Sequence, residues 1–147
     1  MPRLQSIAAR TASRAPMAEF RALNVTVDTG VEGDFRRKLG HRQVTVLSEE
    51  AWKVACANLK IDLPWTTQRA NLLVSDITFS PGSVGRVLEI GEVILEITME
   101  TAPCDRMEKA HTGLREALTP NWMGGVSCRV ILGGLISVGD TFQLRDY

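Results

Sequence analysis

The spacing of short apolar runs along the chain is the sequence feature that most restricts its fold. Glycines and prolines separate these runs throughout the 147 residues, and apolar and polar residues alternate within several of them. Alternation at every second position is typical of a strand with one buried face. A series of short runs between turn residues favours an all-β barrel over alternating strands and helices.

We expect strands in the runs that fit this pattern best, and Val93–Thr98 is the clearest of them. The others are Leu4–Ala9, Leu23–Val27, Gln43–Leu47, Asn71–Val74, Val84–Ile90, Ser127–Leu132 and Leu135–Leu144. Gly133-Gly134 separates the last two runs, and Gly139-Asp140 interrupts the final one, as expected for turns.

Two helices interrupt the strands. Ser48 is a good N-cap, and Glu49 and Glu50 stand in the first turn, where the helix dipole favours acidic side chains. A second helix is predicted from Asp105 to Leu118, with an apolar stripe at helical spacing. The members of this stripe are Met107, Ala110, Leu114 and Leu118. The sequence therefore predicts one domain over residues 1–147, a mainly β and closed or nearly closed β-barrel with a few short helices.

Composition excludes several classes of protein. Apolar residues make up 44% and charged residues 23% of the chain, which is ordinary for a soluble globular protein. The 17 basic and 17 acidic residues cancel, so the chain lacks the broad positive field of a nucleic-acid-binding protein. The longest apolar stretch, Val130–Val138, is about half the length that crosses a bilayer. We therefore expect no nucleic-acid partner and no membrane-spanning helix.

The three cysteines are Cys56, Cys104 and Cys128. Their odd number, their wide spacing and the lack of a signal-peptide pattern indicate free thiols in a reducing compartment, and we predict the cytoplasm of a bacterium. Arginines precede the first acidic residue, Glu19, as in a transit peptide, but we favour a first strand in this region. Cys56 and Cys128 fall within a predicted helix and a predicted strand, so we expect both in the core.

Cys104 is the leading candidate for chemistry. It follows Ala102-Pro103 after the clearest strand, and Pro103 cannot continue a ladder because it has no N–H. The second helix is predicted to begin at the next residue, with Arg106 in its first turn. A helix start and a nearby arginine favour a thiolate, which is the form that attacks, carries sulfur or ligates a metal. The alternative is a small buried residue that fills a corner of the core.

Two adjacent loops are candidate binding segments. The glycines of Gly30-Val31-Glu32-Gly33-Asp34 permit either a tight loop that approaches a ligand or a plain turn between strands. The basic loop Arg36-Arg37-Lys38-Leu39-Gly40-His41-Arg42 follows it closely. Arginines bind phosphate and other oxyanions with paired hydrogen bonds, although a basic run is also typical of a solvated surface. Arg69 and Asn71 form a third polar spot, which is equally compatible with a cap and a turn.

The sequence gives little support for a metal site, a serine nucleophile or a particular histidine base. His41 and His111 stand far apart in the sequence, and no Cys-x-x-Cys pair marks a metal site. No Gly-x-Ser-x-Gly motif is present for a serine nucleophile. Either histidine is compatible with a role as base for Cys104, but nothing selects one. We expect His111 to face solvent, because it lies off the apolar stripe of its helix.

Taken together, these segments resemble the MOSC family, named for the C-terminal domain of molybdenum cofactor sulfurase. They follow the family's order over residues 2–144, nearly the whole chain. The matching segments are Gly30-Val31-Glu32-Gly33-Asp34, Arg42-Gln43-Val44-Thr45-Val46, Arg69-Ala70-Asn71-Leu72, Ile90-Gly91-Glu92-Val93, Pro103-Cys104, Gly124-Gly125-Val126 and Val138-Gly139-Asp140.

The resemblance implies a MOSC-type β-barrel related to the small barrel domain of pyruvate kinase. It also implies binding of molybdenum cofactor (molybdopterin), or of sulfur delivered to it, with Cys104 as persulfide carrier or molybdenum ligand. The partner in the second case would be a sulfur-donor protein, a separate PLP-dependent sulfurase. The residues implied in cofactor binding are Gly30, Glu32, Gly33, Asp34, Arg36, Arg37, Arg42, Arg69, Asn71 and Arg106.

Two further functions remain open. Relatives include enzymes that reduce N-hydroxylated compounds. In this chain the electrons would come from a separate flavin or iron–sulfur partner, because it has no Rossmann fingerprint and no cluster-ligand spacing. Many relatives also place a histidine shortly after the Gly-Asp pair, where this chain has Phe35-Arg36-Arg37. That departure motivates the other alternative, a non-catalytic module that binds an anion or a partner.

Overall fold

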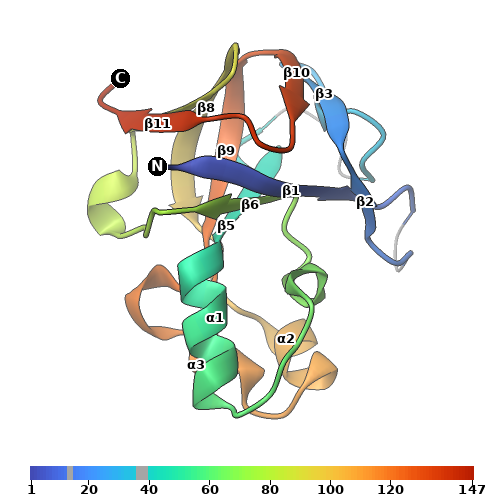
Figure 1. Cartoon of the computed structure of the whole chain (residues 1–147), viewed down its shortest axis with the longest axis vertical. Coiled ribbons are helices and arrows are strands. Elements are labelled where there is room, and N and C mark those ends of the chain that lie inside the picture. The colour runs from blue at the N-terminus through green and yellow to red at the C-terminus, as the bar shows by residue number, and fades with distance from the viewer. Residues whose placement is uncertain (13–14, 36–39) are drawn as a thin grey trace.

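The fold is described from a computed structural model, which covers residues 1–12, 15–35 and 40–147. The protein is mainly β with a few short helices, and its strands form an eight-stranded and a three-stranded sheet. The strands lie at one end of the molecule and the α-helices lie together at the other (Figure 1). Within the described ranges, no helix is long and apolar enough to span a membrane.

Every run predicted as a strand contributes one or two strands. The strands are β1 (Arg3–Ala9), β2 (Ala18–Phe20), β3 (Ala22–Thr26), β4 (Gly30–Val31), β5 (Val44–Ser48), β6 (Leu72–Ser75), β7 (Val87–Ile90), β8 (Val93–Glu100), β9 (Val126–Leu132), β10 (Gly134–Ser137) and β11 (Phe142–Arg145). β2 and β4 are not in the prediction, because they are too short to show alternation. β7 begins later than predicted, because the 3-10 turn η2 (Pro81–Ser83) and the left-handed Gly85 precede it.

The larger sheet has the order β11-β7-β8-β9-β5-β6-β1-β2, and the smaller one has the order β10-β3-β4. β5 pairs in parallel with β6 and antiparallel with β9. The helix α1 (Glu49–Asn58) and the 3-10 turn η1 (Trp65–Gln68) lie in the connection from β5 to β6. This crossover carries η1 to the same end of the sheet as the end of β8.

The prediction of a closed barrel is not confirmed. β11 and β2 are the two edges of the larger sheet, and no ladder joins them among the described residues. The two ends of the sheet approach each other at one isolated bridge between Arg3 and Thr141. Close to it, the amide of Leu4 donates to the carbonyl oxygen of Asp140 over 2.8 Å. Alternation predicts the buried face of each strand, but it does not specify whether the outermost strands pair.

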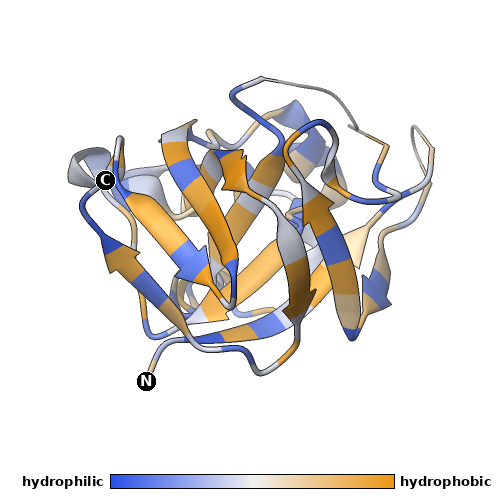
Figure 2. Ribbon diagram, turned by 90° about the horizontal axis from the view of Figure 1, so that it is seen from above, coloured by the Kyte–Doolittle hydropathy of each residue, from blue (hydrophilic) through white to orange (hydrophobic). Residues whose placement is uncertain are grey.

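The apolar residues form two cores. One lies on the inner faces of both sheets and includes Cys128, and the other lies between the larger sheet and the helices and includes Cys56. Both cysteines are buried, as predicted. The alternation of hydrophobic and hydrophilic residues is visible along the strands in Figure 2. Burial in the second core holds α1 close to the end of the sheet that carries the candidate site.

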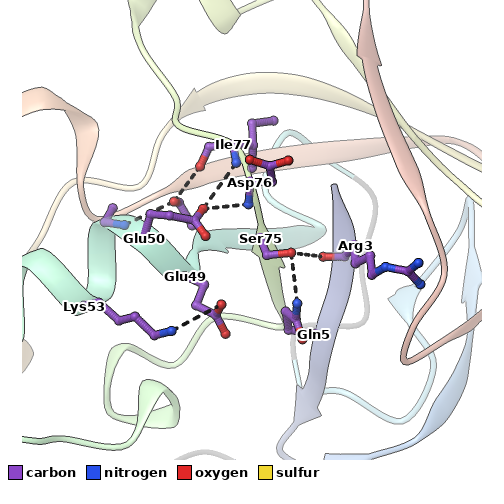
Figure 3. Close-up of polar contacts among 10 residues, drawn as sticks. Arg3, Gln5, Glu49, Glu50, Lys53, Ser75, Asp76 and Ile77 are labelled. Carbon is purple, nitrogen blue, oxygen red and sulfur yellow. Dashed lines mark hydrogen bonds and ion pairs between the residues drawn. The ribbon is translucent and has the colours of Figure 1, made fainter. Parts of the chain in front are cut away.

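The start of α1 is fixed as the sequence predicts. Ser48 Oγ accepts a hydrogen bond from the amide of Ala51 (3.2 Å), which makes Ser48 the N-cap, and donates to the carbonyl oxygen of Ile77 (2.6 Å). Glu50 Oε1 accepts from the amides of Asp76 (2.7 Å) and Ile77 (3.3 Å), as Figure 3 shows. These contacts tie the helix to the segment that follows β6.

The second predicted helix is divided in two. α2 (Asp105–Ala110) is followed by Gly113 in a left-handed conformation (φ +88°), and α3 (Leu114–Leu118) begins after it. The amide of Gly113 donates to Glu108 Oε2 over 2.9 Å, which stabilises the break. The break leaves Ala110 exposed, so only Met107, Leu114 and Leu118 of the predicted stripe are buried. His111 is half-buried rather than solvent-facing, since it lies within the same break.

Candidate functional site

Cys104 lies in a pocket of about 400 Å³ at the helical end of the larger sheet. Its side chain is exposed, so it does not fill a corner of the core. The pocket is lined by Arg42, Thr45, Gln68, Arg69, Thr101, Ala102, Pro103, Cys104, Arg106, Met107 and Ser127. We call this the Cys104 pocket. Its volume is within the usual range for sites that bind small molecules.

The end of β8 and the start of α2 hold Cys104. The amide of Thr101 donates to the carbonyl oxygen of Gly125 over 2.9 Å, and pairing with β9 ends there. Cys104 has an extended backbone (φ −126°, ψ −179°) and its carbonyl oxygen accepts from the amide of Met107 (2.9 Å). This place, after a strand and before a helix, is the one that Pro103 predicts.

Two glycines allow the segments beside the pocket to pack closely. A Cβ on Gly124 would lie 2.5 Å from the carbonyl oxygen of Thr101 and 3.5 Å from Cδ of Pro103. A Cβ on Gly125 would lie 2.3 Å from the carbonyl oxygen of Val46, and Gly125 also has a positive φ of +92°. Side chains at these two positions would push β5, β9 and the Pro103 turn apart.

Three arginines implied by the resemblance line the same pocket as Cys104. Arg42 precedes β5, Arg69 follows η1, and Arg106 lies in the first turn of α2. None of the three takes part in an ion pair with another described residue. Arg69 has a left-handed backbone (φ +69°), and its Nη1 donates to the carbonyl oxygen of Ala15 over 3.2 Å. The pocket therefore combines an exposed thiol with guanidinium groups available to an anion.

Four polar residues of the pocket were missed by the sequence analysis. They are Thr45, Gln68, Thr101 and Ser127. Thr101 Oγ1 and Ser127 Oγ lie 2.8 Å apart in a hydrogen bond. Alternation in β5 places Thr45 on the face opposite Val44 and Val46, so its orientation could have been predicted from the sequence. Gln68 had none, because its place depends on how the β5–β6 crossover folds back.

The glycine-rich loop lies apart from the Cys104 pocket. Glu32 and Gly33 line a different cavity of about 470 Å³, with Phe20 and Leu135 among its walls. Gly30 is packed against Gln43, since an added Cβ would lie 2.6 Å from the carbonyl oxygen of that residue. Asp34 is buried, and its Oδ1 accepts from the amide of Arg10 (3.1 Å). Within the described residues, this loop shapes the junction of β1 and β4 rather than the wall beside Cys104.

Asn71 is close to the pocket but does not line it. Its side chain is buried, its Nδ2 donates to the carbonyl oxygen of Ala8 (3.1 Å), and its Oδ1 accepts from Thr45. Asn71 therefore does not contact the pocket directly but holds Thr45, which lines it, by hydrogen bonds. Arg36 and Arg37 lie outside the described residues, and among the residues described no group of three His, Cys, Asp or Glu side chains is placed to hold a metal ion.

The thiol of Cys128 differs from that of Cys104. It is fully buried in β9, and this burial raises its pKa far above the usual value of 9.0; the carboxylate of Glu96 raises the pKa further. A thiol that is neutral and buried is inert, because attack on an electrophile requires an accessible thiolate. Cys56 is buried as well. Of the three cysteines, Cys104 therefore has the thiol that is accessible to external reagents.

A match to a known domain family identifies the family of this chain. Residues 28–143 match the MOSC domain. The chain belongs to the MOSC family. The matched range includes Cys104 and the arginines Arg42, Arg69 and Arg106 of its pocket. Comparison with curated proteins gives no match.

Solved structures similar to this MOSC chain share its fold. The YuaD protein from Bacillus subtilis has 16% sequence identity and a TM-score of 0.84, with 100% of this chain and 97% of that chain covered. YiiM from Geobacillus stearothermophilus has 14% identity and a TM-score of 0.78, with 98% and 75% covered. YiiM from Escherichia coli has 17% identity and a TM-score of 0.72, with 99% and 70% covered. At these identities the likeness establishes the fold alone.

Proposed function

We propose that this MOSC protein binds molybdenum cofactor, or a sulfur group delivered to it, in the Cys104 pocket, with Cys104 as the acceptor. One observation carries the proposal: an exposed thiol shares a pocket with the guanidinium groups of Arg42, Arg69 and Arg106. Membership of the MOSC family supports it. The free thiols suit a reducing compartment such as the bacterial cytoplasm.

The groups that line the pocket fit the chemistry of this cofactor. Its phosphate would be held by the arginines, since guanidinium groups bind phosphate oxygens through paired hydrogen bonds. The thiolate of Cys104 is a soft ligand, which suits a metal already held by dithiolene sulfurs. When bound, the cofactor supplies the redox chemistry of its metal. The protein's own residues orient the phosphate and present one sulfur atom.

In the sulfur-carrier form of the proposal, the donor is a persulfide on a separate sulfurase. The Cys104 thiolate attacks the terminal sulfur of that persulfide, and the donor's S–S bond breaks as a new S–S bond forms on Cys104. The donor cysteine leaves as a thiolate and takes up a proton from water. No net oxidation occurs, because the transferred sulfur keeps its oxidation state.

The test is expression in a host that makes the cofactor, followed by analysis of molybdenum and of cyanide-labile sulfur. Wild type should retain one of these and Cys104→Ser should lose it. Cys56→Ser is the matched control, because Cys56 is buried in α1 and does not line the pocket. If neither the metal nor the labile sulfur depends on Cys104, the assignment is wrong.

The three arginines also favour a second candidate, a module that binds an anion without chemistry at Cys104. In that case phosphate binding should weaken in Arg69→Ala and be unaffected in Cys104→Ser. A further experiment distinguishes a catalytic function from carriage and from anion binding. The metal-loaded protein is supplied with an artificial electron donor and a hydroxylamine substrate. Turnover would identify a reductase that needs an external electron-transfer partner, and a full metal load without turnover would favour the carrier.

A further inference from the structure

Gln68 joins the two sides of the Cys104 pocket. It is the last residue of η1, and only 7% of its surface is exposed. Its Nε2 donates to the carbonyl oxygen of Gly124 over 2.6 Å. On one side of this bond the chain continues directly into Arg69. On the other side, Gly124 packs against Thr101 and Pro103, the residues that lead to Cys104.

The hydrogen bonding of Gln68 is costly for the folded protein. Its Oε1 is buried and has no hydrogen-bond partner among the described residues. A buried acceptor without a partner destabilises a fold, and an apolar side chain at this position would also leave the carbonyl oxygen of Gly124 without its Nε2 donor. The bond from Nε2 to Gly124 is the one hydrogen bond that this side chain makes among the described residues. The bond connects a residue of the pocket lining next to Arg69 to a glycine packed against the segment that leads to Cys104.

We propose that Gln68 is a positioning residue, which holds the Arg69 side of the pocket against the Cys104 side through its bond to Gly124. Only the identity of the ligand rests on the function proposed above. With the bond in place, the thiolate lies in the field of the arginines, which raises its rate with anionic electrophiles relative to its rate with neutral ones. Without it, η1 and the Gly124 wall separate and this preference falls.

The preference is measurable as a ratio of alkylation rates at Cys104. Iodoacetate carries a negative charge and iodoacetamide is neutral, and both react with the thiolate and release iodide. Their rate ratio therefore cancels the fraction of thiolate and reports the local potential. A single guanidinium about 4 Å from an anion in water is worth about a fivefold change in rate. The ratio should exceed that of the same protein unfolded in urea, and it should fall as salt is added.

We expect Gln68→Met to lower the ratio about twofold to fivefold, because methionine fills the space but donates no hydrogen bond. Gln68→Asn keeps the amide but is one methylene shorter, so it should lower the ratio by the same amount. It also provides a second variant for the test if Gln68→Met does not fold. Ser48→Ala is the matched control. It also removes a 2.6 Å bond from a buried side chain to a carbonyl oxygen, but at the start of α1, and should leave the ratio unchanged.

A wild-type ratio in folded Gln68→Asn would overturn the proposal, as would an equal fall in Ser48→Ala. The ratio is measured without cofactor, so its result is independent of the proposed function. Metal and labile sulfur can be absent while the ratio still depends on Gln68. In that outcome the positioning role stands and the cofactor assignment fails.

Discussion

Asn71 and Thr45 exchange hydrogen bonds through both their backbones and their side chains. The amide of Asn71 donates to the carbonyl oxygen (3.0 Å) and to Oγ1 (3.0 Å) of Thr45. In return, the amide (3.1 Å) and Oγ1 (3.2 Å) of Thr45 donate to Asn71 Oδ1. Asn71, expected from the family resemblance to contact the cofactor, thus fixes a residue of the pocket to the start of β6.

This arrangement predicts that Asn71 is needed for stability without any ligand. Asn71→Ala removes the side-chain bonds to Thr45 and Ala8 and leaves buried groups unpaired, so it should destabilise the protein by about 2–4 kcal/mol. Asn24→Ala is the control, because Asn24 is exposed on β3, and its effect should stay within about 0.5 kcal/mol. Urea denaturation measures both. Wild-type stability in Asn71→Ala, together with loss of cofactor, would instead make Asn71 a ligand contact.

Gly124→Ala should be destabilising because the added Cβ would meet the carbonyl oxygen of Thr101 at 2.5 Å. Overpacking of this kind typically costs about 1–3 kcal/mol. Gly82→Ala is a matched control, since its Cβ would meet only Ser80 Oγ at 3.7 Å and its backbone is not left-handed. The control should be neutral or stabilising by about 0.4–1 kcal/mol. Equal effects of the two changes on the thermal midpoint would contradict the close approach.

Alkylation of the native protein should modify one cysteine. Cys104 is exposed, whereas Cys56 and Cys128 are buried, so iodoacetamide should add a single label before unfolding and three labels in urea. Mass spectrometry of the intact protein counts the labels. Cys104→Ser should take none in the native state. Rapid labelling of a second site in folded wild type would show that the core around Cys56 or the core around Cys128 opens more readily than its burial suggests.

The buried thiol of Cys128 predicts a loss of stability at alkaline pH. Burial raises its pKa, so above pH 9 the folded protein keeps a proton that the unfolded chain releases. Unfolding is therefore favoured as pH rises, by up to about 1.4 kcal/mol per pH unit for one such group. Cys128→Ala removes the group, and its stability should fall less than that of wild type between pH 8 and pH 10. Parallel losses in the two proteins would assign the effect to other residues.

Local patterns predict the strands and the first helix well. In β8 the alternation follows the buried face directly, whereas in β9 Ser127 is buried and Leu132 is exposed. Ser48 caps α1 as its sequence context indicates. The second helix breaks at Gly113, where a left-handed glycine and the Glu108 bond compete with the apolar stripe. Whether the outer strands close is set by long-range packing, which one sequence does not show.

Some residues of the candidate site could likewise be predicted from local sequence, whereas others are placed only by the fold. Cys104 has local signals, a strand end and a proline, and the structure places it exposed at that position. Arg42, Arg69 and Arg106 come from three separate segments, and only the fold brings them together. Gln68 lacks any local signal, because its partner Gly124 is 56 residues further along the chain. The glycine-rich loop has a strong local signal but lies beside another cavity.

The pairing of β5 with β9 brings Val44 opposite Cys128. We expect this long-range pairing to delay completion of the Cys104 pocket during folding. Strands this far apart in sequence pair late, since the intervening chain must first be ordered. A nascent chain that ends before Gly124 already carries Cys104, but it lacks Gly124 and Ser127. In such a chain Arg42, Arg69 and Arg106 are already present, but the Gln68–Gly124 bond beside the thiol cannot yet form. The selectivity for anionic reagents that depends on the Gln68–Gly124 bond would therefore appear only once Gly124 and β9 are in place, and it would serve as a kinetic marker for completion of the Cys104 pocket.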